Sequence, residues 1–291
     1  MATLKETRTR IASVKNTRQV TSAMKMVSAA KLRKVQGLYN KFYPYTDKQH
    51  HILENLARGI DEEDTTSPFF KEPAQTANVL IVAVSSNKGL CGALNANLIA
   101  ETRERIAQYK EQNTKVALYT IGKKVYQTFK KTEDIIASNE EIQEELTYEK
   151  ATVIANKLMD SFVSKQFDRI DFIYSHAKTA STQVATHEEY LPITPPEEND
   201  DVGDINYIFE PNKKEILEVL VPQMLRTQFY KTLLDALVAE HAARMIAMNK
   251  ATDNAGDLLR ELKLEYNKAR QTAITNEILE IVSGAEALNK G

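Results

Sequence analysis

The sequence predicts an α/β protein in which a long antiparallel coiled coil of two helices, one from each end of the chain, carries an α/β domain with a mainly parallel sheet. No proline follows Pro222, and apolar or small residues then recur at spacings of three and four, which is typical of a coiled-coil helix. A second long stretch without proline precedes Pro44. Between these stretches, apolar runs of strand length alternate with helical segments. We therefore expect an N-terminal coiled-coil helix in residues 1–60, an α/β globular domain in residues 74–210 and a C-terminal coiled-coil helix in residues 211–291.

The expected C-terminal helix extends from about residue 223 to 289. Its seam contains few large residues, because threonine and alanine often stand where leucine or isoleucine is usual. Such a seam lets a partner backbone come close but buries little area per turn. The seam residues are Val238, His241, Met245, Met248, Thr252, Ala255, Leu259, Leu262, Tyr266, Ala269 and Ala273.

The N-terminal stretch has a weaker seam, which Arg18 and Lys25 interrupt, so we expect it to need antiparallel packing against the C-terminal helix. Residues 1–41 hold ten basic residues and one acid, Glu6. Three interpretations fit this charge: a solvated basic face, a surface for acidic partners such as nucleic acid or anionic lipid, or a mitochondrial transit peptide. The seam residues are Ile11, Val14, Thr21, Ser28, Leu32, Val35, Tyr39 and Phe42.

The middle of the chain reads as a Rossmann-like domain. The sequence predicts strands at residues 78–85, 115–121, 169–175 and 183–193, and helices from the loop at Gly92 to about 112, at 122–131 and at 148–164. The spacing Gly89-x-x-Gly92 fits neither a dinucleotide-binding nor a phosphate-binding fingerprint, so we interpret it as a tight strand-to-helix turn. Cys91 is expected to be a buried small residue.

Composition and residue spacing indicate no catalytic or cofactor chemistry. The net charge of −2 argues against a nucleic-acid-binding polycation, and one cysteine cannot form an internal disulfide. The adjacent His50 and His51 point to different sides of a helix, and the other histidines are scattered, so no metal site is expected. No apolar run reaches the length of about 18 residues that a membrane-spanning helix needs. We expect no catalytic residues, no cofactor and no metal.

Three segments of the chain stand out: ITNEILEIVSGAEA at residues 274–287, KETRTRIASVKNTRQVTSAMKMVSAAKLRKVQ at residues 5–36, and SSNKGLCGALN at residues 85–95. Together they resemble the gamma subunit of F-type, proton-transporting ATP synthases of the bacterial type. The second segment begins almost at the first residue, so we expect no presequence. By the same resemblance, the acidic partners of the basic helix are loops of catalytic subunits rather than nucleic acid.

The resemblance implies a central-stalk rotor that couples ion-driven rotation of a membrane ring to cycling of a catalytic hexamer for ATP synthesis. Its implied partners are the alternating hexamer of catalytic (beta) and non-catalytic (alpha) subunits, the epsilon subunit and the membrane c-ring, with one copy of this chain per complex. The implied location is peripheral, on the cytoplasmic face of the bacterial inner membrane. The implied contacts with the hexamer are Met24, Lys25, Arg244, Gln271, Thr275 and Glu277, and those of the foot with epsilon and the ring are Tyr207 and Glu210.

Two other classes stay open on the residues alone. One is a coiled-coil tether with an α/β head and no rotary role. The other is a nucleotide-binding enzyme that uses the loop from Gly89 to Gly92. The tether would be a stable dimer alone, whereas the enzyme would bind ATP or NAD as a purified chain.

Overall fold

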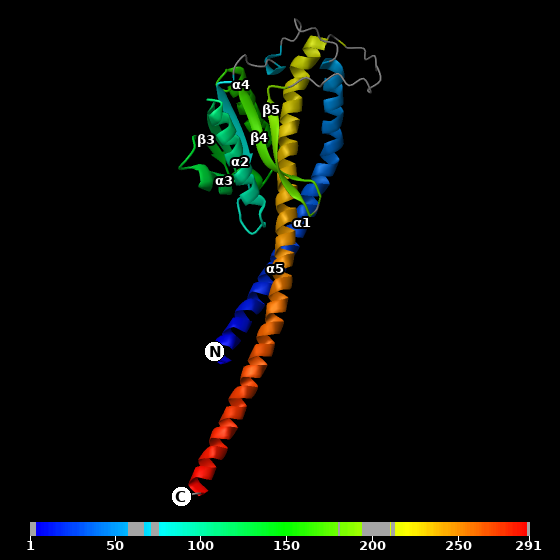
Figure 1. Ribbon diagram of the computed structural model, residues 1–291. Coiled ribbons are helices and arrows are strands. Elements are labelled where there is room, and N and C mark those ends of the chain that lie inside the picture. The colour runs from blue at the N-terminus through cyan, green and yellow to red at the C-terminus, as the bar shows by residue number, and fades with distance from the viewer. Residues whose placement is uncertain are drawn as a thin grey trace. The chain divides into compact units, whose positions relative to one another are not determined.

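The computed structural model describes residues 4–57, 67–70, 76–179, 181–193, 210 and 213–289. The chain forms two compact units, one made of both ends (to Ser28 and from Met245) and the other of Ala29–Arg244. Two long helices, α1 (Leu4–Ala57) and α5 (Lys213–Asn289), each contribute to both units (Figure 1).

In the unit formed by the chain ends, α1 and α5 pair antiparallel. Thr252 Oγ1 donates to Thr21 Oγ1 at 2.8 Å, and Lys25 Nζ donates to Asn249 Oδ1 at 2.5 Å. Positions therefore rise along α1 as they fall along α5, which confirms the predicted antiparallel pair. The buried seam residues of this unit are Thr7, Thr21, Ser28, Met248, Ala255, Leu259 and Leu262.

In the larger unit, α1 and α5 pair through aromatic and polar contacts. The rings of Phe42 and Tyr230 meet edge to face with centroids 5.0 Å apart, and Gln223 Nε2 donates to Tyr45 Oη at 2.8 Å. α5 begins at Lys213, before Pro222, although the sequence predicted a start just after this proline, near residue 223. A proline inside a helix costs about 3 kcal/mol, but its neighbour Val221 is fully buried, and core packing of this turn offsets that cost.

The α/β domain has one five-stranded sheet in the order β3-β2-β1-β4-β5. Strands β1 to β4 are parallel, and β5 pairs antiparallel with β4, so the expectation of a mainly parallel sheet is confirmed. The edge strand β3 was not predicted, because it is short and its side chains are at most half-buried. The strands are β1 (Asn78–Val84), β2 (Lys115–Ile121), β3 (Ile135–Asn139), β4 (Arg169–Ala177) and β5 (Gln183–Leu191).

Helices cover both faces of this sheet, which explains the unbroken apolar run of β1. Leu80, Val82 and Val84 join a core with α4 and α5, whereas Val79 and Ile81 join a separate core with α2 and α3. The remaining helices are α2 (Leu94–Glu111), α3 (Lys123–Phe129) and α4 (Tyr148–Val163), with short 3₁₀ turns at Pro68–Phe70 and Glu141–Gln143.

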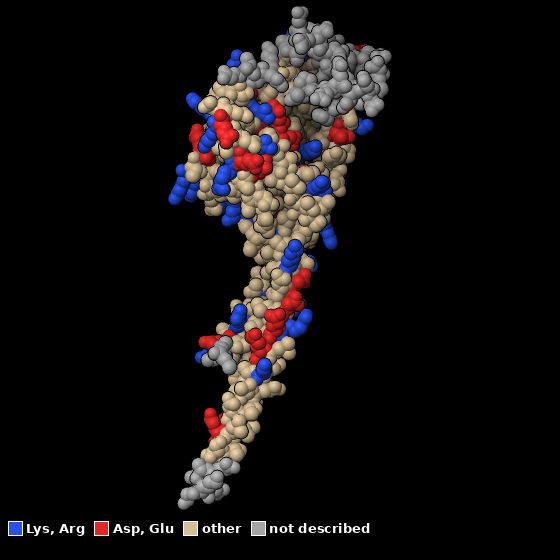
Figure 2. Space-filling view, in the orientation of Figure 1, with Lys and Arg blue, Asp and Glu red and all other residues tan. Residues whose placement is uncertain are grey.

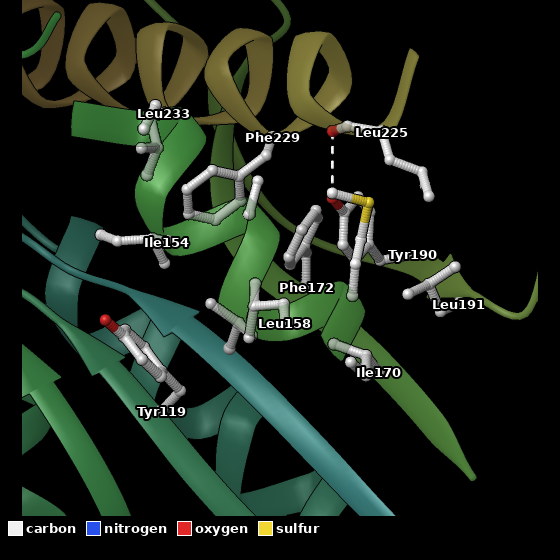
Figure 3. Packing of buried hydrophobic residues seen from close by; sticks show 14 of the residues in the cluster. Tyr119, Ile154, Leu158, Ile170, Phe172, Tyr190, Leu191, Leu225, Phe229 and Leu233 are labelled. Atoms are coloured by element: carbon white, nitrogen blue, oxygen red, sulfur yellow. Dashed lines mark hydrogen bonds between the residues drawn. The ribbon is translucent and has the colours of Figure 1, made fainter. Parts of the chain in front are cut away.

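The larger core fixes the α/β domain to α5. The ring of Phe172 stacks on Tyr190 with centroids 4.3 Å apart, and Phe229 of α5 lies against both (Figure 3). Tyr190 Oη, which is buried, donates to the carbonyl of Leu225 at 3.0 Å (Figure 3). Because sheet and helix share this core, the Ala29–Arg244 unit packs as one body.

Candidate functional site

The two bases that interrupt the α1 seam have matching residues on α5. Lys25 bonds to Asn249, which in turn donates to Asp253 at 3.1 Å. The Arg18 guanidinium lies against Gly256, where an added Cβ would be 3.6 Å from Arg18 Nε. Gly256 therefore marks a place where a long basic side chain crosses α5, and the two bases are part of the pair's packing.

The C-terminal end of α5 has an apolar surface with no cover from the rest of the described chain. The pairing register places Leu4 opposite the turn near residue 270, so the later turns have no α1 residues beside them. Every described side chain from Arg270 to Ala285 is exposed. The large apolar ones are 50–66% exposed: Ile274, Ile278, Leu279, Ile281 and Val282. Ile274, Ile278, Ile281 and Val282 stand at i, i+4, i+7 and i+8 and form one stripe, which Leu279 widens on one side. These five residues are called the apolar tip below.

The predicted contacts of the chain-end unit have different surroundings. Met24 and Lys25 are half-buried, whereas Gln271, Thr275 and Glu277 are exposed. Thr275 Oγ1 donates to the carbonyl of Gln271 at 2.9 Å, so its proton is already used within the helix. Gln271 and Thr275 lie one turn apart on one face of α5, whereas Glu277 points to the other side of the helix. Thr275 and Glu277 lie within the span of the apolar tip.

Arg244, predicted as a partner contact, is buried within the larger unit. Its Nη2 donates to the carbonyl of Lys88 at 2.8 Å, and its Nε donates to the carbonyl of Gly89 at 3.3 Å. Its Nη1 bonds to the carboxylate of Glu240, one turn earlier on α5. Of the two predicted foot residues, Glu210 is exposed and Tyr207 lies outside the described residues.

His241 is a buried, neutral histidine on the same stretch of α5. Burial lowers its pKa to about 4, and the nearby charges of Arg244 and Lys31 add to this effect. Its Nδ1 has no hydrogen-bond partner among the described residues. An imidazole in this setting stays uncharged at neutral pH and packs as part of the core.

The glycine loop after β1 is held by hydrogen bonds within the protein. The backbone N–H of Ser86 donates to Asn95 Oδ1 at 3.1 Å, and Gly92 adopts a φ of 63°. Cys91 is 1% exposed and accepts a bond from Asn95 Nδ2 at 3.1 Å, so the prediction of a buried small residue is confirmed. The positive φ confirms the structural turn at Gly92.

A buried ionic cluster that sequence spacing did not suggest joins β4, β5 and α2. Asp171 is fully buried, bonds to the hydroxyl of Tyr109, and contacts His187 Nε2 at 2.8 Å and Arg169 Nε at 2.9 Å. Burial alone would raise the pKa of Asp171, but the bonds from His187 and Tyr109 and the charge of Arg169 hold it below its ordinary value. A buried carboxylate with these three partners stabilises the pairing of β4 with β5 and the packing of α2.

The pairing part of α5 also carries an acidic stripe that sequence reasoning missed. Asp253, Asp257, Glu261 and Glu265 recur every four residues and are exposed. Acidic side chains accordingly follow one another along this helix in Figure 2. The regular spacing of four was the signal available in the sequence, since it places these side chains on one face.

Searches for metal and membrane features complete the description. Within the described ranges, no group of three or more His, Cys, Asp or Glu side chains is arranged to hold a metal ion. Nor is any helix of those ranges both long enough and apolar enough to cross a membrane.

Comparison with known proteins gives full-length similarity. A family model described as ATP synthase matches residues 3–288. The ATP synthase gamma chain of Christiangramia forsetii is 47% identical over 292 residues, which cover 99% of this chain and 100% of that protein. The ATP synthase gamma chain of Flavobacterium psychrophilum is 48% identical over 288 residues, covering 99% of each. A chain in the Euglena gracilis mitochondrial ATP synthase (OSCP/F1/c-ring, rotational state 3) has a similar fold, with a TM-score of 0.65 and 19% identity over 99% of this chain and 95% of that one.

Proposed function

The chain belongs to the family of ATP synthase gamma chains, and from this premise we propose how its residues perform the work of that family. A gamma chain is the non-catalytic rotor subunit of the central stalk. It couples ion-driven rotation of the membrane ring to conformational cycling of the catalytic hexamer, and so to ATP synthesis. The chemistry takes place in other subunits.

The proposed partners are those of a rotor. The end of α5 enters the alternating hexamer of alpha and beta subunits, and the foot contacts the epsilon subunit and the c-ring, with one copy of this chain per complex. The complex lies on the cytoplasmic face of the bacterial inner membrane, to which this chain is attached peripherally through its partners. Membership of an ATP synthase complex is supported by the relatives, which carry the gamma-chain name over their whole length.

The observation that carries this proposal is the apolar tip. An isolated helix end with five large aliphatic side chains half or more exposed is unfavourable in water, because each such side chain gains about 1.5–3 kcal/mol on full burial. Four of these side chains form one stripe and Leu279 widens it, so the helix end needs a partner that covers a broad apolar face. We assign that cover to the sleeve of the hexamer.

The polar contacts at the start of the tip suit a shaft that must not stick at one angle. Gln271, Thr275 and Glu277 are polar and exposed, and exposed polar or charged pairs contribute only about 0–1 kcal/mol each. We assign Gln271 and Thr275 to a catalytic-subunit loop and Glu277 to a separate contact with the hexamer. Met24 and Lys25 are assigned to the acidic loops of the catalytic subunits, with the neighbouring bases of α1. Arg244 would contact a catalytic-subunit loop only through those N–H groups of its guanidinium that do not bond to Lys88, Gly89 or Glu240.

The proposal is tested by co-expressing this chain with the catalytic and non-catalytic subunits. We expect a stable hexamer that carries one copy of this chain, measured by native mass spectrometry. A hexamer that forms without this chain, or that binds two copies, would contradict the rotor assignment. Calorimetric titration of the purified chain with ATP and with NAD should show no binding heat, because the loop after β1 lacks a phosphate-binding fingerprint and its first N–H, that of Ser86, is bonded to Asn95.

A further inference from the structure

Two polar attachments join α5 to the ends of neighbouring strands in the larger unit. The first, the loop clamp, is the guanidinium of Arg244 on the carbonyls of Lys88 and Gly89, in the loop that follows β1. In the second, the strand clamp, Asp235 Oδ2 contacts His176 Nδ1 at 2.5 Å and Asp235 Oδ1 accepts from Ala177 N at 3.2 Å, at the end of β4. Both α5 side chains are buried, at 8% exposure for Arg244 and 5% for Asp235.

Between the clamps, α5 meets the domain through small residues. Ala239 and Ala243 pack with Cys91 and Leu94 in a small core of their own. Alanine side chains let the helix lie close to the loop. They project so little from the helix surface, however, that they hardly hinder the helix from turning about its own axis. Apolar contact is also non-directional. The larger core holds α5 up to Ala236. Beyond it, the small-residue face holds the helix near the domain but adds little resistance to twisting of this stretch.

The clamps stand on opposite sides of that face. Arg244 follows Asp235 by nine residues, which is about two and a half turns of an α-helix, so the two Cα–Cβ bonds point in opposite directions around the axis. Ala239 and Ala243 lie between them on the side that faces the domain. A rotation of α5 in one sense stretches the strand clamp, and a rotation in the other sense stretches the loop clamp.

Charge makes both clamps directional. Hydrogen bonds in which one partner is ionised are about twice as strong as neutral ones and have narrow geometry. Glu240 holds the Arg244 guanidinium from the other side and so orients it toward the loop. The carbonyls of Lys88 and Gly89 belong to the Ser86–Gly92 turn, which Asn95 ties to α2. The loop clamp thus ends on a braced part of the domain.

We propose that the loop clamp and the strand clamp together prevent the part of α5 beyond the larger core from twisting against the α/β domain, so that torque applied to the domain reaches the rest of the helix. This inference rests on the proposed rotor function and assigns Arg244 and Asp235 as positioning residues for energy coupling. This role differs from a contact with a partner subunit, because Asp235 bonds to His176 of the same chain.

The test uses the assembled ATP synthase in inverted membrane vesicles. Arg244→Gln and Asp235→Asn are made singly and together, and the pair Arg260→Gln with Asp257→Asn is the matched control. In that control pair the arginine and aspartate side chains are 79% and 67% exposed and lie 3.5 Å apart on α5. The first readout is the number of ions pumped per ATP hydrolysed. The second is hydrogen exchange of the backbone amides in residues 86–92 of the complex.

We expect each clamp variant to lower the pumping ratio, the double variant by about twofold or more, and the control pair to leave it unchanged. Amide exchange in residues 86–92 should rise by roughly tenfold in Arg244→Gln, because the loss of one hydrogen bond to a charged group shifts an opening equilibrium by about that factor. An unchanged ratio in Asp235→Asn overturns the proposal, even if Arg244→Gln is impaired, since only Arg244 is also an expected partner contact.

Assembly and folding are separated from coupling in the same experiment. If the wild-type chain gives no pumping complex, the proposed function itself fails, and the clamps are not the cause. If the double variant does not assemble, Arg244→Lys and His176→Gln replace it, because each keeps part of its clamp. A normal pumping ratio in both of these, with faster amide exchange, would show that the clamps are structural only and would overturn their role in torque.

Discussion

Replacing two residues of the apolar tip, Ile278→Ala with Leu279→Ala, should weaken binding of the chain to the hexamer. These side chains are 55% and 57% exposed in the isolated chain. Full burial of a large aliphatic side chain contributes about 1.5–3 kcal/mol, so roughly 1 kcal/mol of each remains to be gained in a sleeve. Losing both gains amounts to about 2 kcal/mol, which corresponds to roughly a 30-fold rise in the dissociation constant.

Titration of the labelled chain into preassembled alpha and beta subunits measures this change. The isolated double variant should keep its melting temperature, because both side chains are exposed and alanine is the best helix former. The control is Val153→Ala with Val163→Ala, which removes two exposed apolar side chains from α4. Burial of the tip in a sleeve would be refuted if the dissociation constant of the tip variant stayed within about threefold of the wild-type value. So small a change is far below the roughly 30-fold rise expected from the lost burial.

Three further outcomes follow from the described contacts. Gly256→Ala should raise the free energy of unfolding by up to about 1 kcal/mol in urea titrations, because an added Cβ would only touch Arg18; a loss of stability would contradict this packing. Reversing Arg18, Lys25 and Lys31 to glutamate should reduce coupled ATP synthesis, and unchanged synthesis would argue against basic contacts with acidic loops. His241 has a folded-state pKa of about 4, below its unfolded value, so the unfolded chain binds more protons between about pH 6.5 and 4. Stability should therefore fall with falling pH across that window by up to about 1.4 kcal/mol per unit, and His241→Gln should remove that slope.

The helical pair was predictable because its signal is local and repeated. Seam residues such as Thr21 and Ala255 stand at coiled-coil spacing, and both are buried. The partners of Arg18 and Lys25 were not predictable, because they depend on the register between helices that are far apart in the sequence. A single sequence fixes the face of each helix but not which residue of one lies opposite which residue of the other.

The strands were predictable to the degree that they are buried on both faces. β1 and β2 are continuous apolar runs, whereas β3 is a short edge strand of mixed character and was missed. The contacts of Arg244 were also out of reach, since Lys88 and Gly89 lie more than 150 residues earlier. The assignment of Arg244 to a partner rests on the resemblance, whereas its bonds to Lys88 and Gly89 are contacts within the structure.

The central claim, that this chain turns inside its hexamer, is tested most directly by watching it turn. A bead is attached to a cysteine introduced by Glu104→Cys on the exposed side of α2, while the native Cys91 is buried and 1% exposed. The complex is fixed to a surface through its catalytic subunits and supplied with ATP. The account predicts stepwise rotation in one direction that stops when ATP is removed. Complexes that hydrolyse ATP while the bead stays still would contradict it.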